Sequence, residues 1–159
     1  MSLTVLKRRN AAAGFTMMEI IITLGVIGIL SALVYPTYLK NSRSAKRADA
    51  RALLLEDAQY MERVFTESNS YMPLNASGVA TTPTLPTIIA PKNTSGTTTN
   101  YDISFAASSV TATGFTLQAV PKNAMSSDPC KTLTYNNLGQ KGTSGTLDDG
   151  MTTQTCWSK

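Results

Sequence analysis

Residues 11–30 read AAAGFTMMEIIITLGVIGIL, and this stretch decides the fold. A cluster of small residues precedes a long apolar run, and a single acid, Glu19, interrupts the run near its start. A carboxylate inside a membrane span costs about 2.5 to 3.5 kcal/mol on insertion scales, so it usually has a partner or a function. The segment predicts a membrane helix whose acid needs an explanation.

The apolar run extends over residues 15–35, which are 21 residues. At about 1.5 Å per residue they form roughly 32 Å of helix, enough to cross a hydrocarbon core of about 30 Å. A cleaved signal peptide is the alternative, but the small residues 11–14 lie before the run and no A-x-A-like site follows it. Length and order therefore favour a retained helix. Basic residues flank both of its ends, so the positive-inside rule leaves its orientation open.

Charge is distributed unevenly along the chain. Lys7, Arg8 and Arg9 precede the apolar run, and a second basic cluster, residues 40–51, follows it. Anionic lipid headgroups would favour both clusters. From residue 52 onward, six Lys or Arg face eight Asp or Glu, a net charge of −2. This balance argues against a basic nucleic-acid module.

Several classes of chemistry lack the residues that they need. The chain has no histidine, which removes His-based catalysis and imidazole metal ligands. Two cysteines cannot build a zinc site unaided, and neither a G-x-S-x-G motif nor a P-loop is present. We therefore expect no enzyme, no catalytic residue, no metal and no cofactor.

Residues 14–36, GFTMMEIIITLGVIGILSALVYP, closely resemble the N-terminus of type IV prepilins. The signature of that family is Gly, then Phe-Thr-x-x-Glu, then an apolar run. A prepilin peptidase cuts after the Gly on the cytoplasmic side and methylates the new N-terminal Phe. The resemblance implies a leader over residues 1–14, a transmembrane and fibre-core helix over 15–36, and an exported head over 37–159.

The resemblance also implies a role for each matched residue. Gly14 would be the last leader residue, Phe15 the N-methylated terminus, and Glu19 the acid that pairs with a neighbouring subunit's terminus. Gly28 and Pro36 match the positions at which pilin helices soften or kink. If the leader were retained, the acid near the headgroups would simply be solvated, and that alternative stays open. The implied partners are other pilin subunits, the prepilin peptidase, the inner membrane and the pilus assembly platform.

Residues 37–68 repeat apolar side chains at three- and four-residue steps, which predicts an amphipathic helix. Together with the span, this gives one helix from about residue 15 to 68, bent at Pro36. Its apolar positions are Ala50, Leu53, Leu54, Ala58, Met61, Val64 and Phe65. We expect its charged side chains to form a solvated or subunit-facing surface: Arg47, Arg51, Glu56, Glu62, Arg63 and Glu67.

The rest of the head predicts a loop and a small sheet. Residues 69–100 form the αβ-loop, because 75–100 hold three prolines, two glycines and no acid, with one short element at 85–89. Alternating apolar residues predict strands in YDISFAA, GFTLQAV and KTLTYNNLGQKG, the last with a turn at 137–142. Three or four antiparallel strands would pack on the amphipathic helix as an α+β roll. This matches the type IV pilin fold, in which the apolar half of the helix protrudes.

Cys130 and Cys156 enclose the last strands of the region 101–159. In an exported domain we expect a disulfide, and its closed loop of 27 residues would stabilise by about 3.5 kcal/mol. The alternative is two reduced thiols in a cytosolic protein. We expect Trp157, beside Cys156, to be a packing residue. The cysteines favour a C-terminal domain outside the cytoplasm. The resemblance then implies an inner-membrane precursor, single-pass with a periplasmic C-terminal domain, that later enters an extracellular pilus.

Later stretches sharpen the resemblance. RADARALLLEDAQYMERVFTESNSY, FTLQAVP, DPCKTLTYNNLGQKG and the final CW resemble minor pilins of the PilE type and the related DNA-uptake pilins. The leading hypothesis is a structural, minor subunit of a type IV pilus that supports pilus assembly, twitching motility, adhesion or DNA uptake.

Two alternatives remain. A DNA-binding minor pilin for natural transformation would need a basic patch on the head, for which the candidates are Lys92, Lys122, Lys131 and Lys141. A pseudopilin of a type II secretion system shares the N-terminus. The better-known pseudopilins often bind calcium in a loop near the C-terminus, and LDDG at 147–150 is weakly similar to such a loop. We expect Asp148 and Asp149 to form a turn, and we rank a metal site a distant second.

Overall fold

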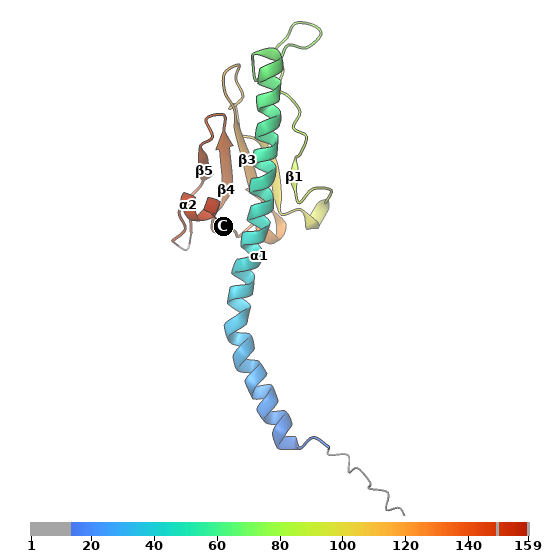
Figure 1. Cartoon of the computed structure of the whole chain (residues 1–159), viewed down its shortest axis with the longest axis vertical. Coiled ribbons are helices and arrows are strands. Elements are labelled where there is room, and N and C mark those ends of the chain that lie inside the picture. Colours follow the sequence, from blue (N-terminus) through green and yellow to red (C-terminus); the bar gives the residue numbers. More distant parts are fainter. Residues whose placement is uncertain (1–13, 149, 159) are drawn as a thin grey trace, which may run out of the picture. The chain divides into compact units, whose positions relative to one another are not determined.

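The structure is a computed structural model that describes residues 14–148 and 150–158. Most of the predicted leader and Asp149 lie outside the described residues. The chain divides into two compact units, one ending at Leu39 and one beginning at Lys40. A single long helix, α1 (Met17–Ser68), contributes to both units, and its extent confirms the helix predicted over residues 15–68 (Figure 1).

The second unit contains a five-stranded antiparallel sheet whose strands are neighbours in chain order. They are β1 (Ile89–Ala90), β2 (Tyr101–Phe105), β3 (Thr116–Pro121), β4 (Thr132–Asn136) and β5 (Lys141–Ser144). Two 3₁₀ turns, η1 (Gly96–Thr98) and η2 (Asn123–Met125), lie between strands, and α2 (Thr153–Ser158) follows β5. Within this unit, α1 lies across one face of the sheet (Figure 1).

The period-2 alternation of the strands places their apolar side chains on that face. In β2, Tyr101 and Ile103 are buried while Ser104 between Ile103 and Phe105 is exposed. The register Ile103↔Ala119↔Leu133 aligns three buried side chains across β2, β3 and β4. The predicted strands and the α+β class are therefore confirmed.

The sheet has more strands than the three or four expected. β1 has only two residues, too few to show a period, and it pairs with β2 through Ile89↔Asp102 and Ala90↔Tyr101. β5 begins at Lys141, so the predicted turn over 137–142 is shorter than expected. Residues 137–140 turn with Gly139 at φ 72°, a backbone conformation that favours glycine.

The apolar stripe of α1 supplies one side of the core, as its spacing predicts. Ala50, Leu54 and Met61 are completely buried among the strand residues. Burial of apolar surface stabilises a fold by about 25 cal/mol per Å², so this contact stabilises the head. An aromatic cluster extends the core, with the Tyr71 ring 4.6 Å from that of Phe65 and 4.9 Å from that of Phe115.

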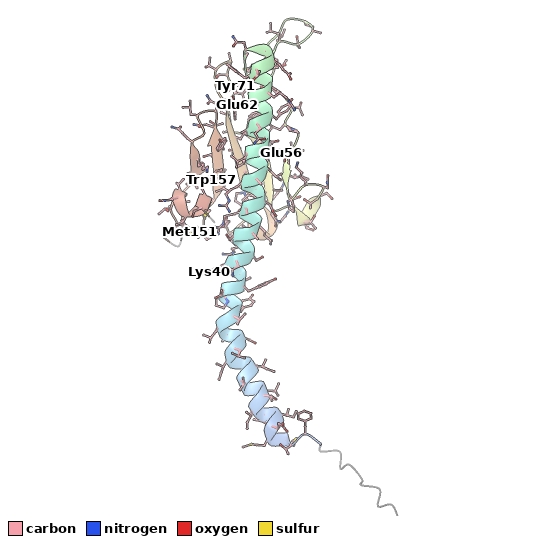
Figure 2. All side chains as sticks on the ribbon, in the orientation of Figure 1. Lys40, Glu56, Glu62, Tyr71, Met151 and Trp157 are labelled. Atoms are coloured by element: carbon pink, nitrogen blue, oxygen red, sulfur yellow. A yellow bond between two sulfur atoms is a disulfide. The ribbon has the colours of Figure 1, made fainter. Side chains whose placement is uncertain are left out.

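Tyr71 connects the end of α1 to the loop that follows it. Its hydroxyl donates a hydrogen bond of 2.9 Å to Glu62, a residue of α1 (Figure 2). Burial, followed by this bond and the charge of Glu62, raises the pKa of Tyr71 to about 12. The tyrosine therefore stays a neutral donor at physiological pH.

Asp57 is a buried acid on α1 that faces the αβ-loop. One of its oxygens, Oδ1, accepts a 3.2 Å hydrogen bond from the Thr87 backbone N–H, and the other has no partner among the described residues. Burial, reinforced by the charge of Glu56, raises its pKa to about 6, although the Thr87 bond and Lys92 oppose the shift. An ionised Asp57 is therefore an unfavourable element of the core at neutral pH.

Substituting Asp57 should change how the stability of the head depends on pH. Because the pKa is raised in the folded state, the wild type loses stability as pH rises from about 4 to about 6, by about 3 kcal/mol in total. Asp57→Asn removes this loss. The variant should therefore be more stable than the wild type at neutral pH and have nearly the same free energy of unfolding at about pH 4. Urea unfolding of the full chain in mild detergent, followed by the fluorescence of its single tryptophan, measures the free energy of unfolding at both pH values.

Asp49→Asn, at an exposed position on the same helix, is the matched control and should show no such difference. A stability difference between Asp57→Asn and the wild type that is the same at both pH values would contradict this account of Asp57.

Candidate functional site

The candidate assembly segment begins just before α1. Gly14, Phe15 and Thr16 precede the helix, and the Phe15 side chain is 79% exposed. The backbone N–H of Glu19 donates a 3.2 Å hydrogen bond to the Thr16 hydroxyl, so Thr16 caps the helix. Glu19 lies in the first turn, where a carboxylate is favoured by the helix dipole. The T-x-x-E spacing of a capping box could have identified Thr16 from sequence.

The segment after Glu19 is apolar on every side. All residues from Phe15 to Leu39 are exposed in the isolated chain, including the large apolar side chains. Within the described residues, one helix is long and apolar enough to cross a membrane. Gly28 and Pro36 both lie inside the uninterrupted α1, and their role in flexibility remains a prediction. This surface has the composition of a lipid-facing or helix-packing segment.

Three buried polar residues connect α1 to the head. The Arg47 Nε donates a 3.1 Å hydrogen bond to Asp128 Oδ1, and the Tyr101 hydroxyl donates a 2.7 Å bond to Asp128 Oδ2. Asp128 and Tyr101 are fully buried and Arg47 is 5% exposed. The prediction that Arg47 belongs to a solvated surface is therefore wrong, because a long cationic side chain can be buried when a buried carboxylate pairs with it. Burial and the bond to Asp128 raise the Tyr101 pKa far above its usual value.

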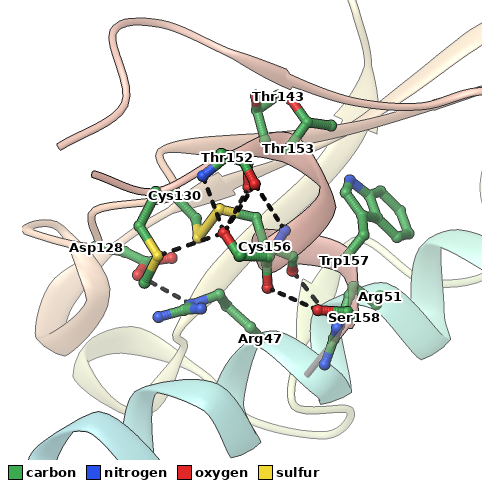
Figure 3. The surroundings of a disulfide bond; sticks show 12 residues. Arg47, Arg51, Asp128, Cys130, Thr143, Thr152, Thr153, Cys156, Trp157 and Ser158 are labelled. Carbon is green, nitrogen blue, oxygen red and sulfur yellow. Dashed lines mark hydrogen bonds and ion pairs between the residues drawn. A yellow bond between two sulfur atoms is a disulfide. The ribbon is translucent and has the colours of Figure 1, made fainter. Parts of the chain in front are cut away.

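The disulfide between Cys130 and Cys156 is present and lies beside this network (Figure 3). Both cysteines are fully buried. Arg51 donates a 3.4 Å hydrogen bond to the Cys156 carbonyl, and burial, followed by the charge of Arg47, lowers the Arg51 pKa. Arg51 is thus partly buried rather than fully solvated, and α1 bonds to Cys156 through Arg51 and to Asp128, just before Cys130, through Arg47.

Trp157 packs as predicted. Its indole N–H donates a 2.8 Å hydrogen bond to the Gly142 carbonyl of β5, and its ring lies 6.1 Å from that of Tyr135. Asp148 lies in a turn that the Met151 N–H closes by a 3.1 Å bond to the Asp148 carbonyl. In the described part of the chain, no group of three or more acids or cysteines could hold a metal ion.

The four lysines named as candidates for DNA binding do not form one free patch. Lys92 pairs with Glu56 at 2.6 Å, Lys122 pairs with Asp102 at 2.6 Å, and Lys131 pairs with Asp148. Lys141 lies over the Trp157 ring, 5.7 Å from its centroid. Three of the four positive charges are therefore partly neutralised within the chain itself.

Residues 36–134 match the family model described as "Type IV minor pilin ComP, DNA uptake sequence receptor". The match covers more than half of the chain. This protein belongs to that type IV minor pilin family. The family is structural rather than enzymatic, and its members assemble with other pilin subunits in a pilus. The matched region includes Arg47 and Asp128 but not the N-terminal segment with Glu19.

Other similarities of the minor pilin are more distant. It is 30% identical over 90 residues to the type II secretion system core protein G of Vibrio cholerae, a match that covers 55% of this chain and 60% of that relative. The Neisseria meningitidis minor pilin PilV is 21% identical, with 69% of this chain and 93% of that chain covered and a TM-score of 0.48. A type IV pilin from Shewanella oneidensis is 23% identical, with 67% and 98% covered and a TM-score of 0.43.

Breaking the buried pair of this minor pilin should destabilise the head strongly. Asp128→Asn preserves shape but leaves the Arg47 charge buried without its counter-charge, which typically costs about 3 to 5 kcal/mol. Asp102→Asn breaks the exposed pair with Lys122 and should cost about 1 kcal/mol or less. The free energy of unfolding in urea, measured at neutral pH on the full chain in detergent, compares the two. Equal losses would show that the buried network does not hold the head together.

Proposed function

We propose that this chain is a structural minor subunit of a type IV pilus, made as a membrane precursor and polymerised through its N-terminal helix. The observation that carries the proposal is the segment from Phe15 to Leu39, whose apolar side chains the chain leaves uncovered. Such a surface is stable in lipid or against other apolar helices and unfavourable in water. A precursor in the membrane and a subunit in a fibre provide these two environments in turn.

Processing would prepare the helix for assembly. A prepilin peptidase would remove the leader, residues 1–14, by cutting between Gly14 and Phe15, and the new amine on Phe15 would be methylated. The mature chain would then consist of the span over residues 15–36 and the head over 37–159. The exposed position of Phe15 and the non-helical backbone at Gly14 support an accessible cut site.

Glu19 would set the register between subunits. In an apolar fibre core its carboxylate is costly alone and favourable beside an ammonium, so a neighbouring subunit's N-terminus at the correct height would be selected. The capping bond of Glu19 uses its backbone N–H only, which leaves the carboxylate free for this role.

The head would lie outside the cytoplasm. A disulfide persists in the periplasm and on the cell surface and is rare in the cytosol, and the bond between Cys130 and Cys156 supports this topology. The precursor would be a single-pass inner-membrane protein that the assembly platform extracts into the pilus. No residue of the chain is assigned a catalytic role, a metal or a cofactor.

Glu19→Gln tests the assembly role with little change to the helix. Glutamine keeps the backbone N–H that bonds to Thr16, so the variant should accumulate in the membrane normally. Its amount in sheared surface fibres should fall by about tenfold or more, because a lost charge pair in an apolar core exceeds 1.4 kcal/mol. Thr16→Ala is the matched control, since it removes the cap, at a cost of about 1 kcal/mol, and retains the carboxylate. Incorporation of Glu19→Gln at the control level would contradict the proposed pairing.

DNA binding is a second candidate function, because the matching family model is described as a DNA uptake sequence receptor. The ion pairs of Lys92, Lys122 and Lys131 weigh against it for this head. We expect the full chain in neutral detergent to show no saturable binding to duplex DNA at physiological salt. Binding whose affinity falls linearly with log salt would instead assign the receptor function, since that slope reports phosphate contacts.

The similarity to a secretion-system core protein leaves a pseudopilus subunit as the remaining alternative. The fibre test also separates this alternative from the pilus. A chain that is processed normally but absent from sheared surface fibres, and needed for protein secretion, would belong to the secretion system.

A further inference from the structure

A basic pocket lies on the second unit, between the start of its part of α1 and the disulfide-closed segment. Its volume is about 360 Å³. Lys40, Arg43 and Arg47 recur at three- and four-residue steps and so share one face of the helix. The other lining residues are Asn41, Ser44, Pro129, Met151 and Thr155. Lys40 and Met151 are labelled in Figure 2.

The pocket contains a buried cation whose hydrogen bonds are incomplete. Arg47 is 5% exposed, and its Nε bonds to Asp128, but its two terminal nitrogens make no hydrogen bond to any described residue (Figure 3). These nitrogens are not among the buried atoms without a partner, so solvent or a ligand can reach them. A guanidinium with two free NH₂ groups is a strong donor for a carboxylate or phosphate oxygen.

Two of the three positive charges of the pocket, those of Lys40 and Arg43, have no paired acid among the described residues. Among residues 14–148 and 150–158, no acidic side chain lines the pocket, and neither Lys40 nor Arg43 forms an ion pair. Asp128, the acid that pairs with Arg47, has both oxygens occupied, by Arg47 and by Tyr101. The pocket is therefore suited to an anion, and the hydroxyl of Ser44 offers a further donor, whereas that of Thr155 already donates to the Thr152 carbonyl.

The place of these residues in the chain identifies the anion. Lys40 directly follows Leu39, the last residue of the apolar segment. Two exposed tyrosines, Tyr35 and Tyr38, end that segment. An apolar run, then tyrosines, then Lys and Arg is the order in which a chain leaves a bilayer through its interface. At that depth the abundant anions are the phosphate groups of lipids.

We propose that the pocket of Lys40, Arg43 and Arg47 binds the phosphate of an anionic phospholipid headgroup. This inference rests on the proposed function, because only a membrane-anchored chain brings the pocket to a headgroup. The lipid would hold the precursor at a defined height in the outer leaflet of the inner membrane, and leaving the membrane for the fibre would require its release. A carboxylate from a second copy of the chain is the competing occupant that the experiment must exclude.

The experiment uses the full chain in a neutral detergent, titrated with phosphatidylglycerol or with phosphatidylcholine, and counts bound lipids by native mass spectrometry. The wild type should retain phosphatidylglycerol in preference to phosphatidylcholine. Lys40→Gln with Arg43→Gln should weaken phosphatidylglycerol binding roughly 25-fold, the equivalent of about 2 kcal/mol for two interfacial charges. Arg47 is left intact because it holds the fold.

Lys122→Gln with Lys141→Gln is the matched control, since it removes two positive charges elsewhere on the head, and it should bind like the wild type. Three results would overturn the proposal: no preference between the lipids, equal losses in both double variants, or displacement of phosphatidylglycerol by inorganic phosphate at equal concentration. Crosslinking of two copies that needs Lys40 and Arg43, without lipid preference, would assign the pocket to a second subunit.

A second assay measures how much of the same proteins stays with phosphatidylethanolamine vesicles after carbonate extraction. It distinguishes a failure of the pocket proposal from a failure of the proposed function. If the wild type resists extraction and the lipid preference is absent, the pocket assignment falls while the spanning subunit stands. If the wild type is extracted, the proposed function falls, whatever the lipid titration in detergent gives.

Discussion

The apolar surface from Phe15 to Leu39 is exposed, and the described residues supply no partner that covers it. Hydrophobic burial is the largest favourable term available to a polypeptide, so an uncovered apolar helix creates a strong drive toward lipid or other helices. A charge such as that of Glu19 is costly there without a matching partner. In the proposed pilus, the same segment would provide both attraction between subunits and a preferred register.

The head depends on contacts within itself, because its hydrophobic core is small. The buried stripe of α1 gives the hydrophobic part of that stability. The bonds of Asp128 to Arg47 and Tyr101 then hold the loop before Cys130 against α1, and the disulfide holds the C-terminal segment to that loop. Because the pair is buried, removing one partner costs more than forming the pair gains. The network therefore favours one arrangement of helix, sheet and C-terminal segment.

Much of this architecture could be predicted from sequence, because it follows from local patterns. The apolar run, the stripe of α1 and the alternation in β2 to β4 all have a period that residues reveal. The polar strand β5 has no apolar residue to mark it and pairs through its backbone with β4. The Arg47–Asp128 pair joins residues 81 positions apart, and nothing local distinguishes Arg47 from its exposed neighbours. The same is true of Asp57 and the Thr87 N–H. Such contacts depend on the fold and become visible only with it.

The mass of the N-terminal peptide of this chain, recovered from sheared surface fibres, tests the central claim most directly. A peptide that begins at Phe15 and is heavier by one methyl group would establish processing, export and assembly in one measurement, and this is the result that the account predicts. A peptide that begins at Met1, from a protein found only in the membrane fraction and absent from fibres, would contradict it. Glu19 would then be a solvated acid at the edge of a simple membrane anchor.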